Sequence, residues 1–375
     1  MSNESALHQA VPEHVRAIAP YQAGKPIEEL ARELGLDPAG IVKLASNENP
    51  LGMPDSAKRA IAAAVSDLAR YPDDAGFELK SAIAARVGVP ADWILLGNGS
   101  SDILNLAAAA TLMPGRSAVF SQYAFAVYGL ATQARGATAV VVPAVDYGHD
   151  LEAMAASIRP DTSLVFITNP NNPTGTYLKA EAIEAFLAQV PRHVVVVLDE
   201  AYNEYLPPAL KTDSIAWVHR HPNLVVSRTF SKAFALAGLR VGYGIAQPAL
   251  ADLLQRVRQP FNVNTVAQAA AAAALADEDF VARSYELNRA GLAQLTSAFD
   301  AMGLEYVPSF GNFVLVKVGP AARINQELLQ RGVIVRPVAN YGLPEWLRVT
   351  VGLEAENTQF IAALRASLEA VKAAG

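Results

Sequence analysis

The chain of 375 residues has no cysteine, no run of basic residues and no long apolar segment. The absence of thiols excludes a disulfide framework and thiolate chemistry, and it fits a reducing compartment such as the cytoplasm. A formal net charge of -6 argues against nucleic-acid binding. The alanine-rich tract 269–276 comes nearest to a membrane span, but it is too short and too weakly hydrophobic to be one.

Signals for targeting and for metal binding are also missing. Residues 1–5 contain no basic region followed by an apolar core, so the sequence predicts no signal peptide. Only two of the six histidines, His219 and His221, are close together, and no carboxylate or further histidine completes a zinc-like pattern. We therefore expect a cytoplasmic protein with no membrane span and no metal ion.

The chain does contain a long alternation of apolar segments and helical patterns. Fifty-two per cent of its residues are hydrophobic, which allows a large core, and its length suggests about two domains. The segments that read as strands are 93–96, 117–120, 138–142, 163–168, 194–198, 224–227 and 241–245. Near-continuous Val/Ile/Leu strands separated by helices predict an α/β fold, in which helices cover both faces of a mostly parallel sheet.

The pattern changes after residue 276. A long helix over 285–299 and a last helix around Phe360 enclose short strands at 313–318, 333–335 and 347–350, which indicates a smaller α+β unit. We predict an N-terminal arm and helix over 1–45 that pack with the small domain. A large domain over 46–272 and a small C-terminal domain over 273–375 follow.

Polar residues follow several of the predicted strands directly. In open parallel sheets, ligands bind beyond the carboxyl ends of the strands, so these residues are expected to gather around one site. They are Gly99 with Ser100 and Ser101, Asn172, Asp199 with Tyr202, and Lys232.

Lys232 lies in an apolar setting that includes Phe230 and Phe234. Burial disfavours the ammonium form and lowers a lysine pKa, which produces a nucleophilic amine. Taken alone, the residue fits a surface lysine whose stem covers apolar area better, because most lysines are of that kind.

Asp199 and Arg240 indicate a binding site only when they are considered together with this lysine. A carboxylate after the apolar strand 194–198 is costly unless it is paired, although a helix cap or salt bridge would also satisfy it. Arg240 could be a structural ion pair or could bind a phosphate together with Thr229 and Ser231. One ligand that uses all three groups has an aldehyde for Lys232, a ring nitrogen for Asp199 and a phosphate for Arg240. Pyridoxal 5'-phosphate meets this description.

The glycine-rich turn 97–101 also permits a nucleotide-binding interpretation. Its glycines and the following helix start could receive an anion. A dinucleotide site calls for an acidic residue near the end of the next strand, which here ends Phe120-Ser121-Gln122, and no P-loop lysine is present. The nucleotide alternative is therefore disfavoured.

The motifs together resemble those of fold-type I pyridoxal-phosphate aminotransferases, over nearly the whole chain and in the family's order. The chain is most similar to members that act on histidinol phosphate. The matching segments are Tyr71-Pro72-Asp73, residues 169–175, Asp199-Glu200-Ala201-Tyr202, residues 227–243, Val335-Arg336-Pro337 and residues 347–352. Two serines in the phosphate loop, and Ser121-Gln122 before Tyr123, depart from the common pattern of the family.

The resemblance implies a role for each matching residue. Lys232 would form the Schiff base and carry a proton, with Asp199 at the ring nitrogen and Tyr202 as the third catalytic residue. The remaining cofactor contacts would come from Gly99, Ser100, Ser101, Tyr123, Asn172, Thr229, Ser231 and Arg240, with Tyr123 stacked on the ring. Substrate would be bound by Tyr21, Asn47, Tyr71, Arg336 and Arg348. In the family arrangement Tyr71 comes from the second subunit of a homodimer.

The implied activity is ping-pong amino transfer from histidinol phosphate to 2-oxoglutarate, a step of histidine biosynthesis. Two other enzymes would use the same site, an aromatic amino-acid aminotransferase and a threonine-phosphate decarboxylase. A regulatory protein that binds the cofactor without turnover is a further alternative, against which the intact lysine, aspartate and arginine set argues.

Overall fold

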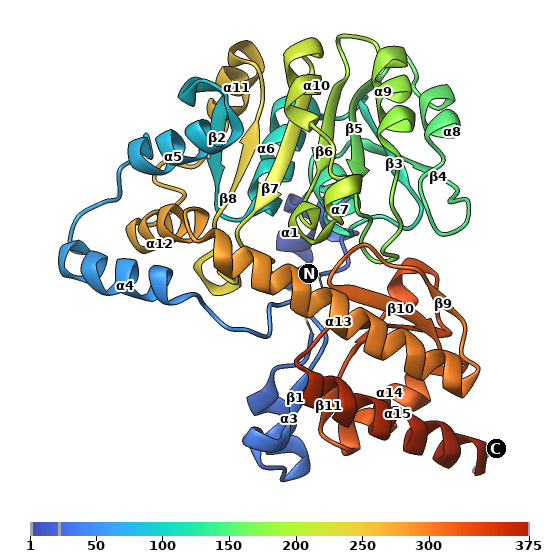
Figure 1. Ribbon diagram of the computed structural model, residues 1–375. Coiled ribbons are helices and arrows are strands. Elements are labelled where there is room, and N and C mark those ends of the chain that lie inside the picture. The colour runs from blue at the N-terminus through green and yellow to red at the C-terminus, as the bar shows by residue number, and fades with distance from the viewer. Residues whose placement is uncertain (1–2, 22–23, 374–375) are drawn as a thin grey trace.

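The computed structural model describes residues 3–21 and 24–373. Residues 1–2 and 22–23 of the predicted N-terminal arm, and residues 374–375 of the predicted small domain, lie outside the described ranges. A large and a small layered unit lie one above the other in Figure 1, with the long helix α13 (Glu278–Met302) running along their junction. None of the helices in the described ranges combines the length and the apolar character that a membrane crossing requires.

The large unit is built on a seven-stranded sheet of order β2-β8-β7-β6-β5-β3-β4. Neighbours from β7 to β4 are parallel, and β8 is antiparallel to both β7 and β2. Its strands are β2 (Ile94–Gly97), β3 (Ser117–Ser121), β4 (Thr138–Val142), β5 (Thr162–Thr168), β6 (Val195–Asp199), β7 (Leu224–Thr229) and β8 (Gly242–Ile245). The predicted α/β fold with a mostly parallel sheet is confirmed.

Helices cover both faces of this sheet, and the burial of alternate strand residues shows why. In β6, Val196 and Leu198 belong to one apolar cluster, whereas Val195 and Val197 belong to another. A strand buried on both faces needs apolar residues at every position, which is how β6 reads. The helices of this unit are α4 (Asp55–Ala64), α5 (Phe77–Val87), α6 (Ser100–Thr111), α7 (Val127–Ala134), α8 (Leu151–Ala156), α9 (Ala180–Gln189), α10 (Ser214–Arg220), α11 (Pro248–Gln255) and α12 (Thr265–Leu275).

The small unit contains a four-stranded antiparallel sheet of order β12-β13-β10-β9. Its strands are β9 (Tyr306–Val307), β10 (Phe313–Lys317), β12 (Arg336–Pro337) and β13 (Trp346–Thr350), and its helices are α14 (Ala321–Gln330) and α15 (Glu354–Ala373). The smaller α+β unit is thus present as expected.

The N-terminal segment joins the small unit through backbone pairing. Strand β1 (Val42–Lys43) runs parallel to β11 (Val333–Ile334), and Leu30 of α3 (Ile27–Leu34) is buried against Ile334. Before them lie α1 (Asn3–Ala10) and the short α2 (Glu13–Arg16), which contacts α7 of the large unit. The boundaries at 45 and 272 stay predictions.

The ends of the central strands are level with one another. Thr168 pairs with Asp199, and Asp199 pairs with Ser227. Side chains that follow β5, β6 and β7 therefore meet at one edge of the sheet, facing the small unit.

Candidate active site

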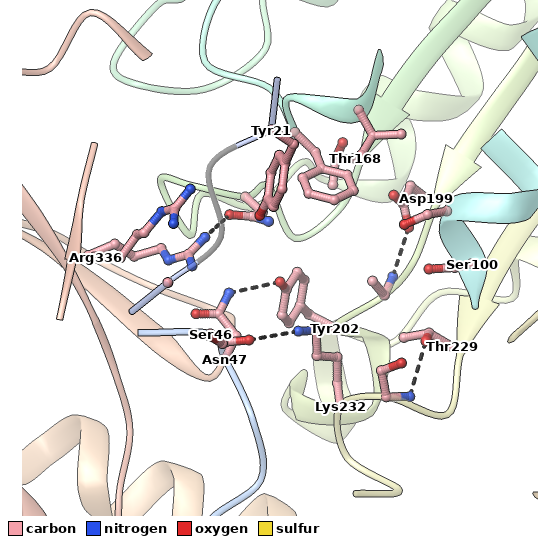
Figure 2. Close-up of a pocket in the computed structure, with 18 of the residues that line it drawn as sticks. Tyr21, Ser46, Asn47, Ser100, Thr168, Asp199, Tyr202, Thr229, Lys232 and Arg336 are labelled. Carbon is pink, nitrogen blue, oxygen red and sulfur yellow. Dashed lines mark hydrogen bonds between the residues drawn. The ribbon is translucent and has the colours of Figure 1, made fainter. Parts of the chain in front are cut away.

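A cavity of about 360 Å³ lies at this edge, between the sheet and the small unit (Figure 2). The predicted site residues that line it are Tyr21, Asn47, Ser100, Ser101, Asn172, Asp199, Tyr202, Thr229, Ser231, Lys232, Arg240, Arg336 and Arg348. The structure thus brings together residues that are up to 327 positions apart, from Tyr21 to Arg348.

Lys232 points into the cavity, and its remaining exposed surface faces that space. Its Nζ donates to the backbone carbonyl of Ser46 at 3.1 Å and lies 5.8 Å from the centre of the Tyr202 ring. Burial, and then the Arg348 guanidinium, lower the Lys232 pKa to about 7. A large share of this amine is therefore neutral and nucleophilic at neutral pH.

Asp199 ends β6 and is 3% exposed. One carboxylate oxygen accepts the N–H of Ala201 at 3.2 Å, and the other accepts the hydroxyl of Tyr128 at 2.9 Å. Burial raises the Asp199 pKa to about 6. Burial weighs against the anion, so a cationic partner in the cavity would stabilise the ionised form.

Tyr202 and Asn172 each receive a hydrogen bond from another element. The hydroxyl of Tyr202 accepts from Asn47 Nδ2 at 2.9 Å, and Asn172 Oδ1 accepts from Arg348 Nη1 at 2.5 Å. With these acceptors occupied, the hydroxyl proton of Tyr202 and the amide donors of Asn172 are oriented toward other partners. Burial raises the Tyr202 pKa to about 12, so the hydroxyl keeps its proton.

One end of the cavity is suited to an anion such as phosphate. Helix α6 begins there at Ser100 with no side-chain cap, which leaves N–H groups of its first turn available to a ligand. Arg240 Nη1 donates to Ser231 Oγ at 3.3 Å, and Thr229 Oγ1 accepts the N–H of Ser231 at 3.1 Å. A Cβ at Gly99, whose φ is +82°, would lie 2.4 Å from Arg240 Nη2, so glycine is required for the approach of Arg240.

The opposite wall carries two arginines that face each other. Arg336 and Arg348 are directly opposed on the antiparallel strands β12 and β13. Arg348 is 7% exposed; its Nη2 donates to the carbonyl of Ala45 at 2.9 Å, and its Nε has no hydrogen-bond partner among the described residues. The Arg336 guanidinium lies 5.7 Å from the ring centre of Tyr21. Opposed like charges are unfavourable, which suits this wall to a bound anion.

A single backbone segment contacts three of these residues. Ala45 and Ser46 accept hydrogen bonds from Arg348 and Lys232 through their carbonyl oxygens, and Asn47 donates to Tyr202. Asn47 has a left-handed φ of 54° and is 1% exposed. Sequence patterns name Asn47 as substrate-binding, and its one direct partner within the site is Tyr202. The contacts of residues 45–46 are made by backbone carbonyls, so the side chains in the sequence did not predict them.

Three predicted residues do not line the cavity. Gly99 acts through the space it leaves for Arg240. The Tyr123 ring lies 6.1 Å from the Tyr147 ring, and Phe125 from the same loop lines the cavity. Tyr71 is 80% exposed and stacks on Phe261 at 4.6 Å, on the outer surface of the chain.

Tyr128 and Thr168 are polar residues of the site that the sequence patterns did not single out. Thr168 lines the cavity, while Tyr128 is completely buried behind it. The N–H of Thr168 donates to Nε2 of the buried His149, whose pKa burial lowers to about 4. Neither residue belongs to a motif in the sequence, so no pattern predicted these contacts.

The donor set fits pyridoxal phosphate. It combines a near-neutral buried amine on Lys232, a buried carboxylate on Asp199, and an anion site formed by the start of α6, hydroxyls and Arg240. Because Gly99 has no side chain, the Arg240 guanidinium can approach this same anion site. This fold and this set of groups define a pyridoxal-phosphate enzyme with an additional binding wall for an anionic substrate.

Comparison with known proteins gives the family. Residues 39–364 match the family described as aminotransferase class I and II, and the chain belongs to that family. It is 67% identical to histidinol-phosphate aminotransferase 1 of Cupriavidus pinatubonensis, over 96% of both chains. It is 66% identical to histidinol-phosphate aminotransferase 2 of Ralstonia nicotianae, over 97% of this chain and 98% of the relative.

The solved structures agree with this assignment. Histidinol-phosphate aminotransferase from Sinorhizobium meliloti, in complex with pyridoxal-5'-phosphate, superposes with a TM-score of 0.88 at 28% identity. The match covers 96% of this chain and 98% of that chain.

Proposed function

We propose that the protein is a pyridoxal-phosphate-dependent aminotransferase that transfers the amino group of histidinol phosphate to 2-oxoglutarate. The observation that carries this proposal is the opposed pair Arg336 and Arg348, next to the buried amine of Lys232. The high identity to relatives with this name over nearly the full chain supports the same substrate and a role in histidine biosynthesis.

The cofactor, when bound, supplies an aldehyde for covalent attachment and a ring that accepts electrons from the substrate carbon. Ser100, Ser101, Thr229, Ser231 and Arg240 would hold its phosphate. Asp199 would pair with the protonated ring nitrogen.

Other residues act on the substrate and on the ring hydroxyl. The near-neutral amine of Lys232 can accept a proton from the substrate carbon and return it to a neighbouring position. Asn172 and Tyr202 are placed to hydrogen-bond the ring hydroxyl.

The two arginines divide the recognition of substrate anions. Arg348 is fixed by Asn172 and Ala45, so its guanidinium is presented in one orientation and suits a carboxylate, as in 2-oxoglutarate. Arg336, beside Tyr21, is placed at the outer part of the wall and suits the phosphate of histidinol phosphate.

A second copy of the chain would complete the site. Val65, Leu68, Tyr71, Phe77 and Phe261 are large apolar residues with exposed fractions from 41% to 80%. Asp74 accepts hydrogen bonds from Arg258 and from the N–H of Phe261, which holds Tyr71 and Phe261 together at the surface. An apolar surface of this kind favours a homodimer in which Tyr71 reaches the neighbouring cavity.

Mixing two inactive variants tests this shared site. A dimer of one Tyr71→Ala chain and one Lys232→Ala chain has one cavity with both residues intact. The proposal expects partial recovery of activity after subunit exchange. No recovery, in a mixture shown to contain mixed dimers, would contradict it.

A substrate panel tests the function itself. Histidinol phosphate, phenylalanine, tyrosine and threonine phosphate are each supplied with 2-oxoglutarate, and glutamate and carbon dioxide are measured. The proposal expects glutamate formation to be fastest with histidinol phosphate. A preference for phenylalanine or tyrosine would support an aromatic aminotransferase instead, and release of carbon dioxide from threonine phosphate would support a decarboxylase.

A further inference from the structure

Behind the cavity wall, the hydroxyl of Tyr128 contacts the carboxylate of Asp199. Tyr128 belongs to α7, is 0% exposed and does not line the cavity. Its hydroxyl lies 2.9 Å from Asp199 Oδ2 and 2.5 Å from Thr168 Oγ1. A carboxylate only accepts, so Tyr128 donates its one proton to Asp199, and Thr168 in turn donates to Tyr128.

The ring of Tyr128 is held in place by its apolar neighbours. It stacks on Phe166 with ring centres 4.5 Å apart and an interplanar angle of 5°, and the ring of Phe125 meets its edge at 6.0 Å. Packing in such a cluster would be served equally well by phenylalanine. A phenol hydroxyl in an apolar interior is unfavourable unless it is hydrogen-bonded, and its two partners here, Asp199 and Thr168, both line the cavity.

We propose that Tyr128 is a positioning residue for Asp199, and that it holds the carboxylate ionised and in one orientation toward the ring nitrogen of the cofactor. Thr168 supports Tyr128 by directing the tyrosine proton toward Asp199. The proposal rests on the proposed function insofar as it assumes pyridoxal phosphate as the cofactor. It does not depend on the identity of the substrate.

The backbone of this arrangement supports the same role. Thr168 and Asp199 are paired residues on the neighbouring parallel strands β5 and β6, so one hydroxyl from α7 can reach both. The N–H of Thr168 also donates to Nε2 of His149, which helps to fix the end of β5. Only one further hydrogen bond to the Asp199 carboxylate, from the N–H of Ala201, comes from the described residues.

The test compares Tyr128→Phe with Tyr177→Phe in the full-length protein. The first variant keeps the ring and removes only the hydroxyl. The second makes the same chemical change at a tyrosine whose hydroxyl donates to the carbonyl of Leu210, away from Asp199. Cofactor is removed, pyridoxal phosphate is titrated back, and its dissociation constant is measured by fluorescence. The ring nitrogen is then followed by nitrogen-15 NMR with labelled pyridoxal phosphate, which reports whether it is protonated.

Loss of a hydrogen bond to a charged group should weaken cofactor binding by about tenfold or more in Tyr128→Phe. The nitrogen-15 signal should move toward the unprotonated position, because a less stabilised carboxylate is the stronger base. Tyr177→Phe should stay close to wild type in both measurements. A Tyr128→Phe protein with wild-type affinity and a wild-type nitrogen signal would overturn the proposal.

A double-mutant cycle separates this role from general packing. In an Asp199→Asn background, adding Tyr128→Phe should change the dissociation constant by less than about twofold, because the charge that the hydroxyl serves is gone. A full additional loss in that background would contradict the proposal. Should Tyr128→Phe not fold, Thr168→Val tests the same chain of hydroxyls, with a smaller loss of affinity expected and wild-type behaviour contradicting it. A wild-type protein that does not bind pyridoxal phosphate would overturn the proposed function, and this inference with it.

Discussion

The two walls of the cavity are built on different principles. On the sheet side, Asp199 and Thr229 end strands β6 and β7, and Lys232 lies shortly after β7. Each has a protein hydrogen-bond partner within the site. On the small-unit side, Arg336 and Arg348 oppose each other on antiparallel strands, and no salt bridge of Arg348 to a described carboxylate is present. The first wall is arranged to hold one resident group, while the second brings two positively charged side chains together, which suits anions that come and go. Changes to the first should therefore affect every substrate, and changes to the second should distinguish among substrates.

The largest effect is expected at Lys232. Replacing it in Lys232→Ala removes both the nucleophile and the proton carrier, so amino transfer should fall by about 10⁴-fold or more with every substrate. Steady-state formation of glutamate measures it. Lys317→Ala, which changes a lysine paired with Glu305 outside the cavity, is the matched control. Turnover of Lys232→Ala equal to that of the control would refute the role.

The arginine wall should respond more selectively. Arg336→Ala should raise KM for histidinol phosphate by about 100-fold, because a charge-assisted hydrogen bond to phosphate is lost, and should spare phenylalanine. Arg348→Ala should raise KM for 2-oxoglutarate, because Arg348 is proposed to bind a carboxylate of that substrate. Equal losses with phosphorylated and unphosphorylated donors in Arg336→Ala would show that the two walls do not divide the work in this way.

A pH profile tests the sheet side without any substitution. Because the Lys232 pKa is lowered to about 7, the neutral amine rises from about a tenth to about nine tenths between pH 6 and pH 8. Formation of the visible chromophore from added pyridoxal phosphate should accelerate about tenfold over this range. A midpoint near pH 10, the range of an ordinary lysine, would contradict the environment described for Lys232.

The smallest effect is expected in the segment that connects the two walls. Asn47 has a left-handed backbone, is hydrogen-bonded to Tyr202, and receives a further hydrogen bond from Thr350. Both Asn47→Ala and Asn47→Gly lose these bonds, but alanine also bears the cost of a positive φ, about 1 kcal/mol. Denaturant unfolding should therefore rank wild type above Asn47→Gly and Asn47→Gly above Asn47→Ala. Equal stability of the two variants would show that the backbone at residue 47 relaxes.

The same contrast explains what could be predicted from the sequence. Lys232, Asp199 and Asn172 lie at or shortly after the ends of apolar strands, and a parallel sheet places such residues together by its topology alone. The contacts of Tyr128 and Ser46 depend on how α7 and residues 45–47 pack against those strand ends, and no local pattern encodes that packing. Tyr71 is exposed on the single chain, and in the proposed homodimer its partner is a second chain. The choice of Phe125 over Tyr123 as a lining residue depends on the path of one loop.

The most direct test of the central claim is a single half-reaction followed by its visible spectrum. The protein loaded with pyridoxal phosphate is mixed with histidinol phosphate alone, the unreacted histidinol phosphate is removed, and 2-oxoglutarate is added afterwards. The proposed function predicts that the visible band is lost with the first addition and returns with the second, with one glutamate formed per site. A band that is unchanged by histidinol phosphate, in protein that still responds to phenylalanine, would contradict it.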